Sequence, residues 1–221
     1  MKPVTPGDDE FNHSLDIGAN ESITEEDRYD SSIRRALLIS TIIFTTALIA
    51  GYSLGFHPSI TEGQGADDFF SEFRDLFAGL AELTRTELAA FIFVNNAVKS
   101  FVFMILGLAL GTLPAFFLLI NGGVIGLVIN LTNVTIGPAF LFAALVPHGI
   151  LEIPALLYGA ALGFKVGSQV WKRIRKQKSF VKESLTRGVK SFLRVVLPML
   201  LLAALIEAFV TPEVIALVTG L

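Results

Sequence analysis

The chain has 221 residues, of which 52% are hydrophobic and 17% are charged, and its mean hydropathy is +0.65. A soluble domain of this length is usually about a quarter charged, so the composition excludes an ordinary soluble domain and indicates a multi-pass membrane protein. The net charge of −3 is unevenly distributed, and the absence of cysteine excludes disulfides and thiolate metal sites.

Two regions follow from the distribution of charge and apolar runs. Residues 1–32 are acidic and polar, contain no apolar signal-peptide core, and are expected to form a mostly disordered cytoplasmic tail. Residues 33–221 are predicted to form an all-α membrane bundle of about five spans with broken or proline-kinked helices. The predicted spans are residues 36–56, 88–120, 122–146, 148–167 and 192–210.

The orientation is predicted from the basic loop, residues 168–191. It contains Lys172, Arg173, Arg175, Lys176, Lys178, Lys182, Arg187 and Lys190. The positive-inside rule places this loop in the cytoplasm, and counting back through five spans places the N-terminus inside as well. The expected location is therefore the cytoplasmic membrane. The loop residues expected to contact anionic lipid headgroups are Lys172, Arg173, Arg175 and Lys176; the same charges would also suffice merely to set the topology.

The segment between the first two spans, residues 66–87, has an amphipathic helical pattern. Its phenylalanines and leucines recur at spacings of three and four, and acidic residues occupy the opposite face. It is interpreted either as an interfacial or partner-docking helix outside the membrane, or as a helix that covers its own bundle.

Ionisable residues in the fourth predicted span point to a buried polar cluster. His148 and Glu152 share a helical stripe with Ala155, Gly159 and Gly163, and such small residues favour close helix packing. The predicted topology brings further polar residues to the same outer level, and ionisable groups at that depth usually pair. The members of the predicted cluster are Asn95, Asn96, Lys99, His148, Glu152 and Glu207.

We expect Lys99 to pair with Glu152 or Glu207. The cluster could fix helix packing alone, or form a site for a substrate, a proton or a partner residue. Pro154 favours a site, because it removes a backbone donor and such broken helices often line cavities. His148 and Glu152 could supply two zinc ligands with His57 as a third, but neither a metal nor another cofactor is expected.

The sequence also contains two GxxxG pairs, Gly107/Gly111 and Gly122/Gly126. These small faces suit close helix packing and could also support a homodimer.

The strings NNAVKSFVFMILGLALGTLPAFFLLINGGVIG (Asn95–Gly126) and PHGILEIPA (Pro147–Ala155) resemble the stage II sporulation protein M family of integral membrane proteins. The matching motif residues are Asn95, Asn96, Gly107, Asn121, Gly122, Gly126, Pro147, His148, Gly149, Glu152 and Pro154. The resemblance implies a non-enzymatic membrane anchor or scaffold for a complex of envelope-remodelling proteins.

The resulting expectation is a scaffold that organises partner proteins at the cytoplasmic membrane. Its expected partners are anionic lipids, membrane or envelope proteins and a second copy of the chain, but not nucleic acid. One alternative is a transporter or channel that uses Lys99, His148, Glu152 and Glu207, with Asn130 and Asn133 at mid-membrane. A second alternative is an intramembrane metal-dependent enzyme.

Overall fold

The computed structural model describes residues 25–57, 71, 79, 82–135 and 137–220, and this part of the chain is an all-α bundle without strands. Its helices are α2 (Glu25–Leu54), α5 (Arg85–Ile105), α6 (Thr112–Thr135), α7 (Pro138–Ile174), α8 (Val181–Ser191), α9 (Leu197–Phe209) and α10 (Thr211–Thr219). A short 3₁₀ turn (Leu106–Leu108) follows α5, and a short π-helical segment (Phe192–Val196) joins α8 to α9.

Five stretches of the described residues are long and apolar enough to cross a membrane. They are Ser31–Leu54, Arg85–Leu108, Thr112–Asn133, Gly149–Ile174 and Val181–Phe209. Helices are the expected form, because a spanning segment must satisfy its backbone hydrogen bonds internally. The predicted fold class is confirmed.

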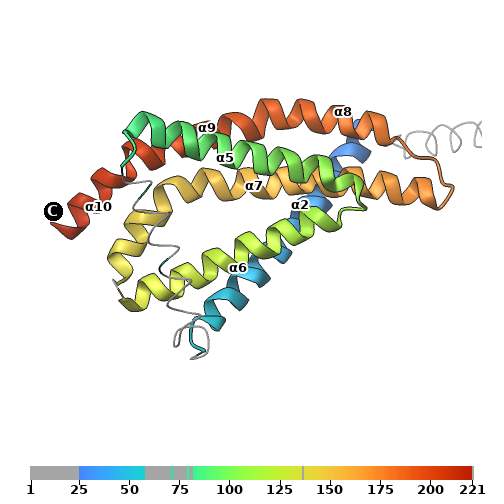
Figure 1. Ribbon diagram of the computed structural model, residues 1–221. Coiled ribbons are helices and arrows are strands. Elements are labelled where there is room, and N and C mark those ends of the chain that lie inside the picture. The colour runs from blue at the N-terminus through green and yellow to red at the C-terminus, as the bar shows by residue number, and fades with distance from the viewer. Residues whose placement is uncertain (1–24, 58–70, 72–78, 80–81, 136, 221) are drawn as a thin grey trace, which may run out of the picture.

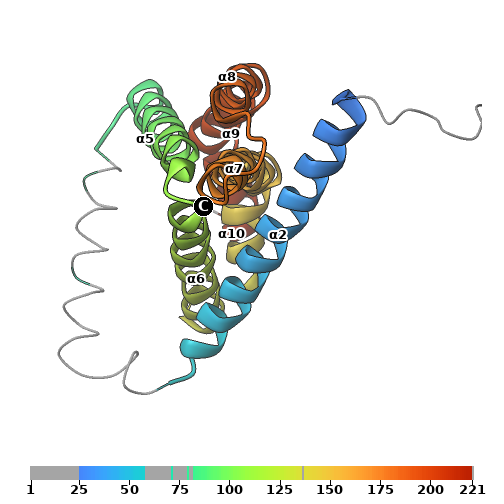
Figure 2. The same cartoon turned by 90° about the vertical axis from the view of Figure 1, so that its right-hand side faces the viewer.

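The helices form two groups (Figures 1 and 2). In Figure 1, α5, α7 and the continuous α8–α9 run lie alongside one another, whereas α2 and α6 cross diagonally on one side. The connection between α7 and α8 lies at one end of the bundle, and α10 lies at the opposite end.

Glycines bring α2 and α6 into backbone contact. A Cβ atom on Gly126 would overlap the carbonyl oxygen of Leu48, and a Cβ on Gly51 would overlap the backbone of Gly123. A Cβ on Gly122 would lie 2.6 Å from the carbonyl oxygen of Phe44. The predicted Gly122/Gly126 pair is therefore a helix-packing face within one chain.

A second glycine contact holds α7 against the end of α5. Gly107 packs on the backbone of Gly163, and Gly167 packs on Leu110 and Gly111. Both GxxxG pairs are thus in contact inside the chain, and the homodimer stays a prediction.

The predicted span boundaries differ from the helices at several points. The run 88–120 is divided, because Leu110 and Gly111 adopt positive φ angles of 60° and 77° and form a turn before α6. The break expected at residue 121 does not occur, since the Asn121 side chain donates to the carbonyl oxygen of Phe117 at 2.8 Å within α6.

Further boundaries move at α7, α8 and the N-terminus. Pro147 and Pro154 both lie inside α7, whose first arm, Pro138–Pro147, turns away from the long part of the helix (Figure 1). The basic loop is partly helical, because α8 begins at Val181 and runs into the last span. α2 begins at Glu25, within the predicted tail. The rest of that tail and most of the amphipathic segment 66–87 lie outside the described residues.

The start of α5 is fixed by a capping box. The Thr84 backbone N–H donates to Glu87 Oε2 at 2.9 Å, and the Glu87 backbone N–H donates to Thr84 Oγ1 at 3.3 Å. These reciprocal bonds satisfy two amides that a helix start otherwise leaves open. Arg85 also forms a 2.7 Å ion pair with Glu213, which ties α10 to this end of α5.

Candidate functional site

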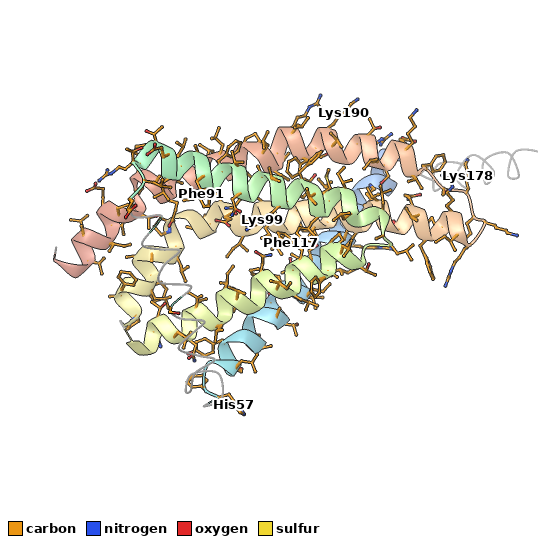
Figure 3. The ribbon with its side chains drawn as sticks, viewed as in Figure 1. His57, Phe91, Lys99, Phe117, Lys178 and Lys190 are labelled. Atoms are coloured by element: carbon orange, nitrogen blue, oxygen red, sulfur yellow. The ribbon has the colours of Figure 1, made fainter. Side chains whose placement is uncertain are left out.

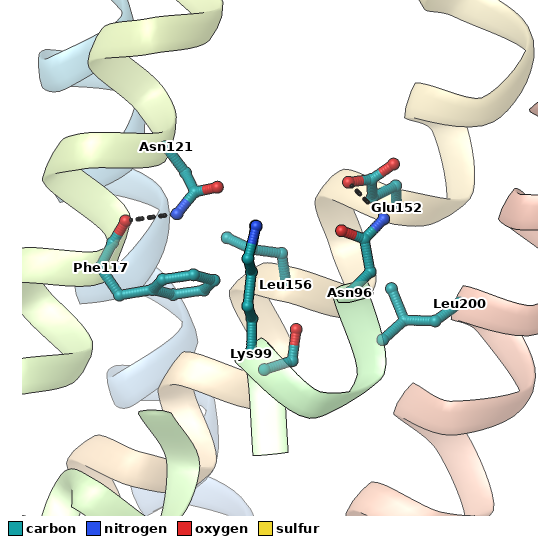
Figure 4. Close-up of a pocket in the computed structure, with 8 residues that line it drawn as sticks. Asn96, Lys99, Phe117, Asn121, Glu152, Leu156 and Leu200 are labelled. Carbon is teal, nitrogen blue, oxygen red and sulfur yellow. Dashed lines mark hydrogen bonds between the residues drawn. The ribbon is translucent and has the colours of Figure 1, made fainter. Parts of the chain in front are cut away.

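A small polar cavity lies among α5, α6, α7 and α9 (Figure 4). Its volume is about 30 Å³, and it is lined by Asn96, Lys99, Ser100, Phe117, Asn121, Glu152, Leu156 and Leu200. One water needs roughly 10–15 Å³ of such space, so the cavity has room for about two waters. Five of its eight lining residues are polar, an unusual composition for the interior of an apolar bundle.

A hydrogen bond between α5 and α7 forms one wall of this cavity. Asn96 Nδ2 donates to Glu152 Oε1 at 3.1 Å, and Asn95 Nδ2 lies 3.5 Å from Asn96 Oδ1. The stripe predicted on α7 faces protein as expected, because Ala155, Gly159 and Gly163 are buried below Glu152. The carboxylate therefore points into the bundle.

Lys99 brings a positive charge to the same cavity. Figure 4 shows its ammonium group between Asn121 and Glu152. The Asn121 amide nitrogen is engaged by Phe117, and its amide oxygen lies on the side of Lys99. In the described part of the chain no ion pair joins Lys99 to Glu152 or Glu207, so the expected direct pairing is not formed. The cavity lies where that contact was expected.

Two other members of the predicted cluster are placed differently. Glu207 is half-buried on α9 and accepts a hydrogen bond from Thr211 Oγ1 at 3.2 Å, near the start of α10. It does not line the cavity. His148 belongs to α7, but its side chain lies outside the described part of the structure. The arrangement therefore joins Asn95, Asn96, Lys99 and Glu152 and separates Glu207 from them.

Sequence reasoning missed Ser100 and Asn121 as cavity residues. Ser100 lies four positions after Asn96, on the same helical face, and this spacing could have identified it. Asn121 lies between two predicted spans, and only the observed course of α6 brings it to the cavity.

A buried lysine was also missed. Lys165 on α7 is only 6% exposed, and its neighbours Leu162 and Val166 are buried too. Other helices surround most of α7 at this level, where Ala161–Gly163 and Lys165–Gly167 are all buried. The sequence offered no periodic signal, because both faces of the segment are apolar or small.

Two other residues singled out in the sequence, Gly149 and Asn130, do not line the cavity. A Cβ on Gly149 would meet only Ile153 of its own helix, so no close approach requires this glycine. The asparagine of the transporter alternative, Asn130, is 1% exposed and packs against Gly55, and its Nδ2 has no hydrogen-bond partner in the described part of the chain.

Metal ligands do not converge within the described residues, where no group of three His, Cys, Asp or Glu side chains could hold an ion. Figure 3 shows His57 at the far tip of α2, well away from Lys99.

The proposed headgroup residues Lys172, Arg173, Arg175 and Lys176 are exposed at the end of α7, where Arg175 lies 4.6 Å from the centre of the Trp171 ring. Lys176 adopts a positive φ of 55° just after α7 ends. Their contact with lipid stays a prediction.

The five apolar helices and the internal glycine contacts define a multi-pass, all-α membrane protein. The sequence model of the family "Stage II sporulation protein M" matches residues 37–212, and the chain belongs to this family. A relative from Methanocaldococcus jannaschii, "Uncharacterized protein MJ0793", is 37% identical over 83 residues. That match covers 35% of this chain and 44% of the relative, so the chain spans less than half of the relative's length. No solved structure matches.

Proposed function

We propose that the protein is a non-enzymatic scaffold that organises partner proteins at the cytoplasmic membrane. In this proposal the N-terminus and the basic connection between α7 and α8 lie in the cytoplasm, as the positive-inside rule favours. The C-terminal helix α10 then lies at the outer side.

The observation that carries the proposal is the close backbone packing of the helices together with the small size of the polar cavity. Backbone contacts at the glycines leave little freedom between α2 and α6 or between α5 and α7. The cavity itself has room for about two waters, which is too little for an organic solute. Such an arrangement suits a rigid platform better than alternating access.

The surface most suited to a partner in this proposal is α10. Leu217 is 84% exposed and Val218 is also exposed, on a short helix that projects from the end of the bundle. An ion pair between Arg85 and Glu213 fixes this helix to α5.

Photo-crosslinking from native membranes tests the scaffold. A photoreactive residue at Leu217 is expected to give a discrete protein adduct, whereas one at Ile42, an exposed residue in the middle of α2, is expected to contact lipid and give none. Discrete adducts at neither position, nor at Val218, would contradict a stable scaffold. The adduct partner is then identified by mass spectrometry.

A second candidate, passage of a proton or small ion, is favoured by the cavity residues Lys99 and Glu152. A lysine without an ion pair in the described part of the chain, beside a carboxylate and room for water, can take part in proton transfer. Purified protein in vesicles with an internal pH dye should then show a flux that Glu152→Gln abolishes and Arg85→Gln leaves unchanged. Equal flux in protein-free vesicles would reject this candidate.

A further inference from the structure

The connection between α7 and α8 projects beyond the rest of the bundle. Gly167 packs on the turn between α5 and α6, and a Cβ atom on Gly188 would lie 3.9 Å from Met104 Sδ near the end of α5. Residues 168–187, here called the basic hairpin, therefore extend past this level (Figure 1). The seven helical residues from 168 to 174 alone give about 10 Å of projection.

A groove of about 610 Å³ opens on this hairpin. It is lined by Arg173, Ser179, Phe180, Val181, Lys182, Glu183 and Thr186. Glu183 forms a 2.7 Å ion pair with Arg187, whereas Arg173 and Lys182 have no carboxylate partner in the described part of the chain. Phe180 in the groove and Trp171, two residues before Arg173 on α7, are each 45% exposed. The surface thus combines unneutralised cations with exposed aromatic rings, and it fits an acidic segment that also carries apolar side chains.

We propose that the chain's own N-terminal segment, residues 1–24, docks in this groove. The segment carries five carboxylates against the single lysine Lys2. The carboxylates are Asp8, Asp9, Glu10, Asp16 and Glu21, and the large apolar residues between them are Phe11, Leu15 and Ile17. Charge and apolar content are therefore both complementary to the groove.

The attachment point supports docking within one chain. Ile33 of α2 and Val189 of α8 both pack against the core cluster that contains Met104, and Figure 1 shows that α2 begins towards the same end of the bundle as the basic hairpin. From Ile33 back to Glu25, α2 adds about 12 Å beyond that level. At about 3.4 Å per residue, Glu21 can reach roughly 14 Å and Asp8 roughly 58 Å from Glu25. These lengths exceed the projection of about 10 Å that residues 168–174 give beyond the same level.

Covalent attachment also favours this segment over a free anion. A short flexible linker gives an effective concentration in the millimolar range, and opposite charges further raise the rate of encounter. A docked segment would cover Arg173 and Lys182 and so compete with any other anionic partner of the hairpin.

The test uses the full chain, which has one tryptophan, Trp171, and no cysteine. A dansyl label on Ser14→Cys accepts energy from Trp171 when the segment is docked. Transfer is measured in a neutral detergent at low salt. One variant neutralises the segment (Asp8→Asn, Asp9→Asn, Glu10→Gln, Asp16→Asn and Glu21→Gln), and another neutralises the groove (Arg173→Gln with Lys182→Gln). The matched control, Lys190→Gln with Arg194→Gln, removes the same charge outside the groove.

The parent and the control should show strong transfer, and both neutralised variants should lose most of it. Removing one exposed ion pair lowers the equilibrium constant for docking roughly 1.5- to 5-fold, so the loss of five charges suffices to release the segment. Salt at 1 M, with a screening length of about 3 Å, should have the same effect. Circular dichroism and gel filtration confirm that all variants remain folded.

Three results would overturn the proposal. The first is equal transfer in the parent and the neutralised-segment variant, or an equal loss in the groove and control variants. The second is transfer that falls on dilution with unlabelled Trp171→Phe chain, which has no donor, and this would mean that the segment docks on a second copy. The third is absent transfer in the parent while phosphatidylglycerol, but not phosphatidylcholine, shifts the Trp171 emission, which would identify the occupant as anionic lipid.

Discussion

A single methyl group at Gly126 tests the contact between α2 and α6. The Cβ atom of Gly126→Ala would overlap the carbonyl oxygen of Leu48 and lie 2.8 Å from the backbone nitrogen of Tyr52. Both obstructing atoms belong to the backbone of α2, so no side-chain rotation can relieve the clash. The two helices would have to separate.

The same helix offers a matched control. A Cβ on Gly123 would meet only the carbonyl oxygen of Ala47, at 3.9 Å, which is an ordinary contact. Both substitutions gain the helix propensity of alanine over glycine, about 1 kcal/mol in water, so this term cancels between them. Overpacking in a close-packed interior costs about 1–3 kcal/mol, and a backbone obstruction belongs at the upper end. We expect Gly126→Ala to be about 2–3 kcal/mol less stable than Gly123→Ala.

The assay is reversible unfolding in mixed micelles, in which the fraction of dodecyl sulfate is raised and helicity is followed by circular dichroism. The free energies of unfolding of the parent, Gly126→Ala and Gly123→Ala are compared in the same detergent. If both variants unfold at the same detergent fraction, α2 and α6 do not meet through their backbones at Gly126, and the packing argument is wrong.

Three further predictions concern the polar residues and the topology. Glu152→Ala should lower the free energy of unfolding by about 1–3 kcal/mol, because the Asn96 donor loses its acceptor, while Glu152→Gln keeps an acceptor and should lose less. Asn130→Leu, which removes a buried donor without a partner in the described part of the chain, should leave the same free energy unchanged or raise it. Ser179→Cys, the only cysteine in its variant, should react with an impermeant maleimide in inside-out vesicles and not in intact cells; the reverse pattern would invert the proposed topology.

The sequence predicted the helices well and their ends less well. Long apolar runs must become spans, and small residues at spacings of four must face other helices, so the bundle and the inward stripe below Glu152 could be predicted. The turn between α5 and α6 could not, because one of its two positive φ angles belongs to Leu110, a residue that rarely adopts that conformation. Asn121 suggested a turn by composition, yet its bond to Phe117 lets α6 continue.

Three polar residues of the candidate site were predictable from the sequence, but their contacts were not. A common depth for Asn96, Lys99 and Glu152 follows from the order of the spans alone. Which of them touch depends on the angles between helices, and no sequence pattern gives those angles. Glu207 is an example, because it was predicted at the same depth but accepts a hydrogen bond from Thr211, near the start of α10.

The contact between α5 and α7 has two parts, the close packing of Gly107 on Gly163 and the hydrogen bond between Asn96 and Glu152. Towards the basic hairpin, Gly107 rests on the backbone of Gly163, and dispersion between close backbones holds the helices together. Towards the other end, where α5 and α6 have diverged and a cavity separates them, Asn96 and Glu152 supply the contact instead. A carboxylate is costly in lipid, so this end is stable only while Glu152 keeps its donors inside the bundle. Loss of the Asn96 bond should therefore loosen the cavity end of α5 and leave the end beside Gly107 closed, which hydrogen exchange along α5 would resolve.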